Sequence, residues 1–353
     1  MVHVRRPLWE SGHLTVTMAN GLNDGDSFNA WKLHHDMLQL DFLLRKMPTL
    51  GLQQLGAENA TLEWVRGKLL PSYIDLFEAT QRGEPHSELL SRFSRLHGIY
   101  NRALYIEASP AISGFSGSVL AAAAESKVQV AGTALENGSI FAIVDDLLVE
   151  QALTELQWML QASTIWFGVL PQREHILLHT SLLDGLHSTL LLQIASELRK
   201  LLPGILRSPL RDVVARKYHI AGQQNSGTGI HTLDAETVAC LFALPARKTS
   251  EDEAVDGGLR IYNAIAPVSW SESEAFDWSV ELRASPHKAA LLSASSSAAA
   301  YESVAHVPNR LAFWHGGHLV ESEPSKFKTA QYEESRVELY FLFGSQGRWA
   351  QGR

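Results

Sequence analysis

The sequence has 353 residues, of which 45% are hydrophobic and 19% charged, a balance typical of a globular protein with two domains or one large one. The formal net charge of −8 argues against a nucleic-acid-binding protein, which usually carries an excess of basic residues. A single cysteine, Cys240, excludes an internal disulfide and a cysteine-rich zinc site. We find no secretory signal and no apolar stretch long enough to span a membrane, so we expect a cytoplasmic protein.

The first third of the chain is predicted to be a loose arm followed by helices. Residues 1–26 are polar and rich in Gly, Asn and Asp towards their end, which favours a flexible arm. Helical patterns then begin near residue 27 and recur at about 60–81 and 86–105, with Gly83 and Pro85 between the last two. Small residues at 109–124 indicate a connector. Residues 27–135 are therefore predicted to form a helical N-terminal region.

The rest of the chain, from about residue 136, is predicted to consist mainly of strands. A strand at 139–144 is followed by two amphipathic helices, and short β-type segments then alternate with loops. The helices are predicted at 149–162 and 186–202, and the later strands at 213–220, 237–244, 259–262, 310–314 and 337–343. This pattern is typical of a β-sandwich or jelly roll. The Ala- and Ser-rich tract at 289–300 fits either a surface loop or a small helix.

Several short motifs follow one another through the chain, and their order matters more than any single motif. Residues 227–234 read Gly-Thr-Gly-Ile-His-Thr-Leu-Asp, and Asn309-Arg310 and then Arg336 follow downstream. The other motifs are Lys32–Gln39, Tyr100–Arg102, Ser163–Trp166, Leu190–Arg199, Lys217-Tyr218, Gly257–Tyr262 and Phe343-Gly344.

In this order the motifs resemble a family of 2-oxoglutarate/Fe(II)-dependent oxygenase-like proteins, over roughly residues 139–345. The resemblance implies an α+β fold in which a helical N-terminal region precedes a double-stranded β-helix, a cupin-like jelly roll, over residues 136–353. It also implies Fe(II) and 2-oxoglutarate as cofactors, and a small-molecule or peptide substrate that undergoes hydroxylation or a related oxidation. No nucleic-acid or membrane partner is expected.

Such enzymes hold iron with two histidines and one carboxylate, and leave the other metal positions open for the co-substrate and oxygen. The first two ligands are spaced His-x-Asp because residues i and i+2 of a strand point to the same side. The second histidine comes from a later strand. An arginine beyond it grips the far carboxylate of 2-oxoglutarate, a bidentate task that suits a planar guanidinium group.

The metal site is incomplete in this sequence. His231 falls on the first ligand, but Leu233 stands where the carboxylate belongs and Val320 where the second histidine belongs. The candidate metal ligands are therefore His231 with two displaced residues, Asp234 and His318. Asp234 could reach the metal only through a β-bulge, and His318 only through a two-residue slip. Alternatively, His231 is a histidine of the core or of a turn, Asp234 is a solvated aspartate, and His318 belongs to a Gly/His loop at a sheet edge.

The co-substrate site is better preserved. Arg336 falls on the arginine that would bind 2-oxoglutarate, and Tyr218 is a second candidate contact for this cofactor. Alternatively, Arg336 is a strand arginine that pairs with Glu334 or Glu338, and Tyr218 is a tyrosine of the core. An inward-pointing arginine would need either an internal acidic partner or an anionic ligand, because an unpaired buried charge is costly.

Three functional hypotheses follow from these residues. The first is an active oxygenase that uses the displaced ligands, and the second is metal-independent isomerase or cyclase chemistry in the same pocket. The third is a non-catalytic protein that binds or regulates. Motifs for dinucleotide binding, phosphate-loop binding, zinc-protease chemistry and the serine-hydrolase nucleophile are absent from the sequence.

Overall fold

The computed structural model describes residues 28–48, 61–96, 98–107, 118–171, 176–219, 224–225, 228–244, 257–267, 300–323, 325–326 and 332–345. Its helices are α1 (Ala30–Lys46), α2 (Leu62–Trp64), α3 (Leu70–Gln81), α4 (His86–Phe93), α5 (Ala122–Glu136), α6 (Glu150–Ala162) and α7 (Thr189–Leu201). Its strands are β1 (Phe141–Val144), β2 (Gly168–Pro171), β3 (Ile176–Ser181), β4 (Leu210–His219), β5 (Gln224–Asn225), β6 (Thr237–Leu244), β7 (Gly258–Ile265), β8 (Tyr301–Ala305), β9 (Arg310–His315), β10 (His318–Glu323), β11 (Ser325–Lys326) and β12 (Arg336–Phe343). A π-helical turn at Val65–Leu69 and 3-10 turns at Leu182–Asp184 and Tyr332–Glu334 complete the described elements.

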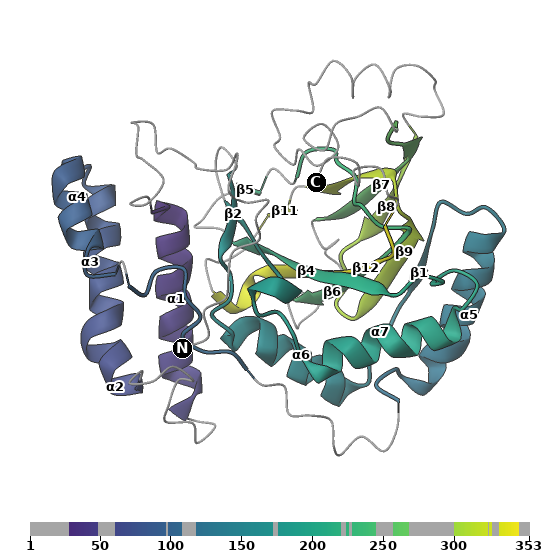
Figure 1. Cartoon of the computed structure of the whole chain (residues 1–353), viewed down its shortest axis with the longest axis horizontal. Coiled ribbons are helices and arrows are strands. Elements are labelled where there is room, and N and C mark those ends of the chain that lie inside the picture. The colour runs from purple at the N-terminus through teal and green to yellow at the C-terminus, as the bar shows by residue number, and fades with distance from the viewer. Residues whose placement is uncertain are drawn as a thin grey trace.

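The N-terminal helices α1 to α4 stand together at one side of the strands (Figure 1). Helix α1 begins where the side chain of Asn29 accepts hydrogen bonds from the backbone N–H groups of Trp31 and Lys32, at 2.9 and 3.1 Å. Gln39 of α1 attaches this region to the sheet. Its side-chain amide donates to the backbone oxygens of Gln161 and Ser163 at the end of α6, at 3.1 and 2.8 Å.

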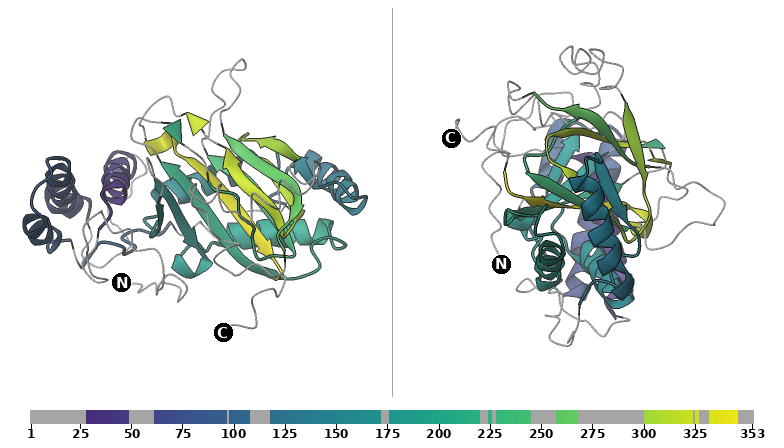
Figure 2. Two further views of the ribbon diagram at one scale, coloured as in Figure 1. Left: turned by 90° about the horizontal axis from the view of Figure 1, so that it is seen from above. Right: turned by 90° about the vertical axis from the view of Figure 1, so that its right-hand side faces the viewer.

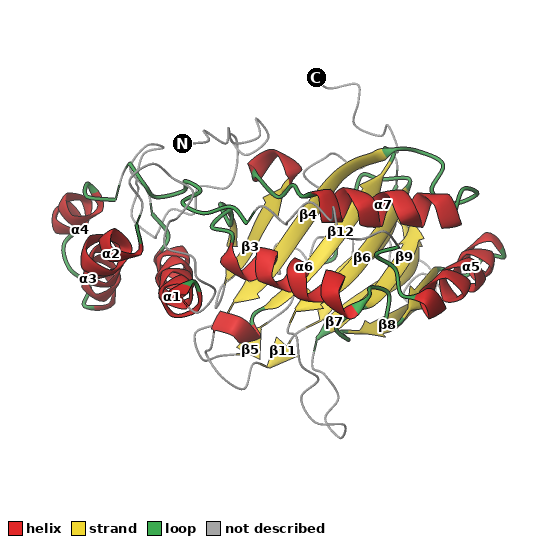
Figure 3. Cartoon of the chain, turned by 90° about the horizontal axis from the view of Figure 1, so that it is seen from below, coloured by secondary structure: helices red, strands yellow, loops and turns green. Residues whose placement is uncertain are grey.

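In the described part of the chain, the strands form a seven-stranded sheet, a three-stranded sheet and a two-stranded pair. The large sheet has the order β1-β9-β6-β12-β4-β3-β2 and the smaller one the order β10-β7-β8, and every pairing is antiparallel. Helices α6 and α7 lie across one face of the large sheet (Figure 3). Figure 2 shows the same layers from two further sides.

Both faces of the large sheet are buried, so its central strands have no solvent-exposed side. Every residue of β6 and β12 is buried. On the helix face, Val337, Leu339 and Phe341 of β12 share a core with α5, α6 and α7. On the opposite face, side chains of β6, β9 and β12 share a second core with β7, β8 and β10 of the smaller sheet. The two sheets therefore pack face to face, and polar side chains on this second face are enclosed between them.

The sequence prediction of an α+β protein is confirmed at the level of a large antiparallel sheet covered by helices. The expected helix at 86–105 ends at Phe93, and the expected connector at 109–124 runs into α5, which the sequence analysis missed. Helix α5 buries Ala124, Val128, Ala131 and Leu135 at helical spacing. Strands β2, β3 and β8 were missed as well. The arm at 1–26 and residues 289–299 lie outside the described residues. In the described residues, no helix combines the length and the apolar character needed to cross a bilayer.

Candidate functional site

The face of the large sheet that lies against the smaller sheet carries a cluster of buried charged side chains. Arg216 of β4 and Glu338 of β12 are fully buried, and Arg336 of β12 is 2% exposed. The strand register places Arg336 opposite Tyr218, and Glu338 opposite Arg216. Because side chains two residues apart point to the same face of a strand, all four lie on one surface between the two sheets.

Arg336 points into the interior between the two sheets, the orientation for which the sequence required an acidic partner or an anionic ligand. Its guanidinium group stacks on the ring of Tyr218, with a distance of 3.9 Å to the ring centroid. Its Nη2 lies 3.4 Å from Oε1 of Glu338, so the internal ion pair that the sequence allowed is present. Nη1 donates to the backbone oxygen of Glu323 at 3.5 Å. Nε and Nη2 have no hydrogen-bond acceptor among the described residues, although both are buried.

Glu338 is held by hydroxyl groups as well as by charge. Its Oε2 accepts hydrogen bonds from Tyr340 at 2.6 Å and from Tyr218 at 3.0 Å. The Tyr218 hydroxyl also contacts that of Ser322 on the smaller sheet. Burial, followed by the nearby Glu338 carboxylate, raises the pKa of Tyr218, and burial raises the pKa of Tyr340 well above its usual range. Both phenols therefore remain protonated donors at neutral pH.

His231 is fully buried beside this cluster, where its two ring nitrogens have different partners. Nδ1 lies 2.8 Å from the backbone oxygen of Gly229, and Nε2 lies 3.2 Å from Nη1 of Arg216. A carbonyl oxygen only accepts hydrogen bonds, so Nδ1 carries the proton and Nε2 presents its lone pair to the guanidinium group. The backbone of His231 pairs with that of Val320 through two hydrogen bonds, at 2.9 and 2.7 Å.

The three side chains predicted as metal ligands do not come together. Asp234 lies outside the buried cluster, where its carboxylate bonds Arg211 at 2.5 Å and accepts from Ser345 at 3.0 Å. His318 is half-buried, and its Nδ1 lies 2.9 Å from the backbone oxygen of Tyr262. Within the ranges that the structure describes, no group of three or more His, Cys, Asp and Glu side chains could hold a metal ion.

Apolar side chains occupy the two positions where the family pattern would place the missing ligands. Leu233 and Val320 are 6% and 1% exposed, and both belong to the core between the sheets. The lone pair of His231 that would bind a metal faces the Arg216 guanidinium instead. The residues present therefore do not fit Fe(II) at this position.

Two polar members of the cluster, Arg216 and His179, were not predicted as site residues from the sequence. His179 of β3 lies opposite Arg216 of β4 in the strand register. Burial, followed by the nearby Arg216 charge, lowers the pKa of His179 to about 4, so its ring is neutral at physiological pH. The only sequence signal was a basic residue inside an apolar strand, a pattern that usually marks a solvent-facing side chain. Here the smaller sheet covers this face of the strand, and no local sequence pattern indicates that contact.

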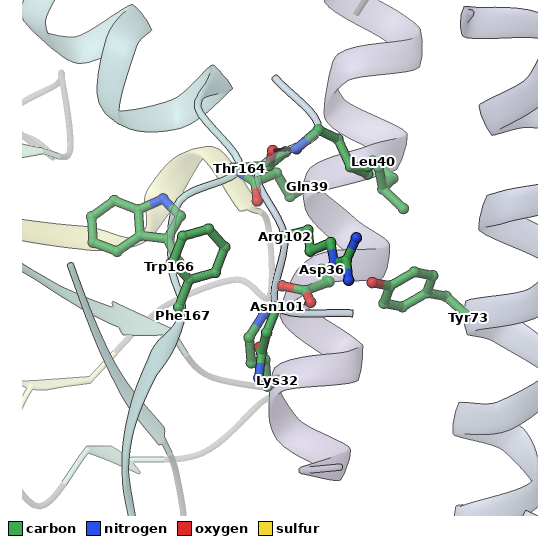
Figure 4. A pocket seen from close by; sticks show the side chains of 11 residues that line it. Lys32, Asp36, Gln39, Leu40, Tyr73, Asn101, Arg102, Thr164, Trp166 and Phe167 are labelled. Atoms are coloured by element: carbon green, nitrogen blue, oxygen red, sulfur yellow. Dashed lines mark hydrogen bonds and ion pairs between the residues drawn. The ribbon is translucent and has the colours of Figure 1, made fainter. Parts of the chain in front are cut away.

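A separate pocket lies where the helical region meets the sheet (Figure 4). It encloses about 320 Å³ of empty space, part of it open to solvent. Its wall on α1 carries Lys32 and Asp36, an ion pair at 2.6 Å. The other lining residues are Gln39, Leu40, Tyr73, Asn101, Arg102, Leu104, Thr164, Trp166 and Phe167. None of the polar-cluster residues lines this pocket, so the two sites are distinct.

The comparisons with known proteins give only distant likenesses. No family profile matches the sequence, and no curated protein matches it. A prolyl-4-hydroxylase from Pseudomonas putida matches 62% of this chain and 100% of its own, at 13% identity and a TM-score of 0.37. A prolyl hydroxylase from Trichoplax adhaerens, in complex with a hypoxia-inducible-factor peptide, matches 65% and 94%, at 12% identity and a TM-score of 0.40. HygX from Streptomyces hygroscopicus, with nickel and 2-oxoglutarate bound, matches 61% and 86%, at 10% identity and a TM-score of 0.39. At TM-scores below 0.5, these likenesses leave the family of this chain open.

Proposed function

We propose that this chain is a 2-oxoglutarate/Fe(II) oxygenase-like protein with a jelly-roll core that binds a carboxylate ligand without iron. The observation that supports this proposal is the Arg336 guanidinium group. It is buried between two sheets, and two of its donors, Nε and Nη2, lack a hydrogen-bond acceptor among the described residues.

The donor geometry of Arg336 favours a carboxylate. Nε and Nη2 form one edge of the planar guanidinium fork, and such an edge binds both oxygens of a carboxylate at once. Buried donors without acceptors are costly, so a ligand that satisfies them gains affinity. Glu338 satisfies Arg336 only in part, because its Oε2 is taken by two tyrosine hydroxyls and its Oε1 lies 3.4 Å from Nη2.

Iron chemistry is not part of this proposal. His231 turns its lone pair towards Arg216, and the flanking positions hold Leu233 and Val320. A metal held by a single imidazole binds weakly, because affinity depends on the number and geometry of the ligands. On this proposal, Arg336 binds a carboxylate, whereas the surroundings of His231 are apolar at Leu233 and Val320 and cationic at Arg216.

Calorimetric titration of the full chain with 2-oxoglutarate in EDTA tests the proposal. We expect saturable binding, and a loss of at least roughly tenfold in affinity for Arg336→Gln, which equals about 1.4 kcal/mol. Arg260→Gln is the matched control, because Arg260 is a strand arginine that pairs with Glu321 and Glu323 instead. Binding that requires Fe(II), or iron-dependent turnover of 2-oxoglutarate, would support an active oxygenase. Failure of the parent protein to bind would contradict the proposed function.

A further inference from the structure

The pocket between the helical region and the sheet has charges of both signs in its wall. Nζ of Lys32 lies 2.6 Å from Oδ2 of Asp36, and the two side chains are only 4% and 13% exposed. The ammonium group has three N–H donors, of which this hydrogen bond uses one. The exposed Arg102 lines the same pocket. A ligand with a single charge would therefore meet a like charge as well as an opposite one, whereas a ligand with both charges can complement the ion pair.

Asn101 adds a buried acceptor that lacks a donor. Its Oδ1 has no hydrogen-bond partner among the described residues. Its φ of 59° lies in the left-handed region, which asparagine tolerates better than most other residues. A buried acceptor without a donor costs about 1–3 kcal/mol, so a ligand that supplies an N–H group gains affinity. Because Asn101 lines the pocket together with the Asp36 carboxylate, a positively charged N–H donor such as an ammonium group suits this part of the wall.

The rest of the wall favours a small ligand that also carries an acceptor. The hydroxyl group of Tyr73 points towards Asp36 and Arg102 (Figure 4). Burial, followed by the nearby Asp36 carboxylate, raises the pKa of Tyr73 well above its usual range, so the phenol remains a protonated donor at neutral pH. The rings of Trp166 and Phe167 form an apolar part of the lining. The empty space of about 320 Å³ is at the lower end of the roughly 300–1,000 Å³ of ligand sites, so a short apolar group fits best.

We propose that this pocket binds a free α-amino acid with a short side chain. Its ammonium group binds Oδ1 of Asn101 beside Asp36, and its carboxylate binds Lys32 and Tyr73. This site goes beyond the proposed carboxylate function, because it shares no residue with the polar cluster between the sheets. The ligand contacts α1, α3 and the segments after α4 and after α6, so it would also join the helical region to the sheet.

A series of three small ligands tests the proposal by calorimetry of the full chain. Propanoate is alanine without the ammonium group, and ethylamine is alanine without the carboxylate. We expect saturable binding of L-alanine, and at least roughly tenfold weaker binding of each analogue. These measurements use the parent protein alone, so they do not depend on the folding of any variant. No binding of L-alanine, or equal affinity for L-alanine and propanoate, would overturn the proposal.

Asn101→Gly tests the assigned acceptor, because glycine keeps the left-handed backbone and removes the amide. This variant should bind L-alanine at least roughly tenfold more weakly and change the affinity for propanoate by less than about twofold. Asp146→Gly is the matched control, since Asp146 also has a positive φ, of 56°, but does not line the pocket. An Asn101→Gly variant that binds L-alanine as tightly as the parent protein would show that the site is wrongly assigned.

The ion pair has a control on the same helix. Asp36→Asn should weaken L-alanine at least roughly tenfold. Asp41→Asn should leave its affinity unchanged, because Asp41 pairs with Arg45 at the same i, i+4 spacing but is half exposed and does not line the pocket. Equal losses in the two variants would contradict a specific role for Asp36.

Arg336→Gln separates this proposal from the proposed function. We expect this variant to keep its affinity for L-alanine within about twofold while it loses affinity for 2-oxoglutarate. A tenfold loss for L-alanine in Arg336→Gln would place the amino acid between the sheets and overturn this proposal. The expected ligand preference would support it even if the parent protein failed to bind 2-oxoglutarate, a result that contradicts only the proposed function.

Discussion

Glu338 lies opposite Arg216 in the paired strands β12 and β4, and the same carboxylate forms an ion pair with Arg336 at 3.4 Å. This buried carboxylate is therefore paired with one buried cation and lies opposite a second one in the strand register. Two tyrosine hydroxyls fix its orientation, because Tyr218 and Tyr340 both donate to Oε2. The carboxylate is thus central to the stability of the polar layer as well as to any ligand that enters it.

Replacing Glu338 by Gln should lower the free energy of unfolding by about 3–5 kcal/mol, because it leaves the buried Arg336 guanidinium group without the carboxylate of its ion pair. Saturating 2-oxoglutarate, the probe of the proposed carboxylate site, should then stabilise this variant more than the parent protein. Glu323→Gln is the control, since Glu323 is a partly exposed partner of Arg260 whose loss should cost about 1 kcal/mol or less. Urea denaturation measures both variants, and a loss below 1 kcal/mol for Glu338→Gln would show that the layer does not depend on this charge.

Acid should destabilise the protein through His179. Burial lowers the folded-state pKa of His179 from 6.5 to about 4. The ring contributes no penalty above pH 6.5, and stability is lost as the pH falls from 6.5 through 4, because the unfolded chain binds the proton more tightly. The share of His179 in this loss should reach about 3 kcal/mol at pH 4. His179→Gln should flatten the dependence of the unfolding free energy on pH over this range, and a profile parallel to that of the parent would contradict the assignment.

Gly168→Ala should be destabilising by about 1–3 kcal/mol, because the added methyl group has no space. A Cβ at Gly168 would lie 2.1 Å from Nε2 of the buried His179 ring. Gly67→Ala provides a matched control, since a Cβ there meets nothing within 4 Å. Gly67 is exposed within a helical segment, so alanine should stabilise the chain there by roughly 0.5–1 kcal/mol. Thermal unfolding of the two variants should therefore shift in opposite directions.

Lys217→Met should stabilise the protein by roughly 1 kcal/mol at pH 7. Nζ of Lys217 is buried without a hydrogen-bond partner among the described residues, 3.7 Å from the Tyr332 ring centroid and 5.1 Å from that of Trp166. The rings favour the charged amine, but burial is the larger effect and lowers the pKa of Lys217 well below 10.5, against the opposing influence of Asp36 and Glu333.

The advantage of Lys217→Met should shrink as the pH rises. The unfolded chain keeps the lysine proton that the folded chain binds poorly, so the parent gains stability up to about pH 10.4. Lys68→Met, at an exposed helical position, should change stability by less than about 0.5 kcal/mol. Urea denaturation at pH 7 and pH 9.5 measures both effects. A parent protein more stable than Lys217→Met at pH 7 would mean that the two rings outweigh the cost of burial.

The sequence predicted the elements whose apolar pattern is strong, and it failed where burial depends on a partner far along the chain. Strand β12 alternates Val337, Leu339 and Phe341 with polar residues, and this alternation was readable. The same alternation normally places Glu338 in solvent. Only the smaller sheet, which includes the missed strand β8, turns that face into an interior. No local sequence pattern indicates that a second sheet covers this face of β12.

The Asn309-Arg310 motif, to which the sequence assigned no specific role, has a structural one. Asn309 has a positive φ of 64°, and its side chain exchanges two hydrogen bonds with the backbone of Leu148, at 2.8 and 2.9 Å. Arg310 grips both carboxylate oxygens of Asp145, at 2.5 and 2.9 Å. These contacts hold the segment after β1 against the start of β9, so the Asn309-Arg310 pair maintains the architecture.

The Gln39 amide that joins α1 to the end of α6 makes the helical region and the sheet mutually dependent. Removing α1 would deprive the backbone oxygens of Gln161 and Ser163 of a shared donor, at a cost of about 1–3 kcal/mol for the buried Ser163 oxygen if it is left unsatisfied. Tyr332, just before β12, donates to the same Gln161 oxygen at 2.6 Å. Heat or denaturant should therefore unfold both regions in a single transition, and α1 to α4 would be a poor choice of module to transfer to another protein or to delete.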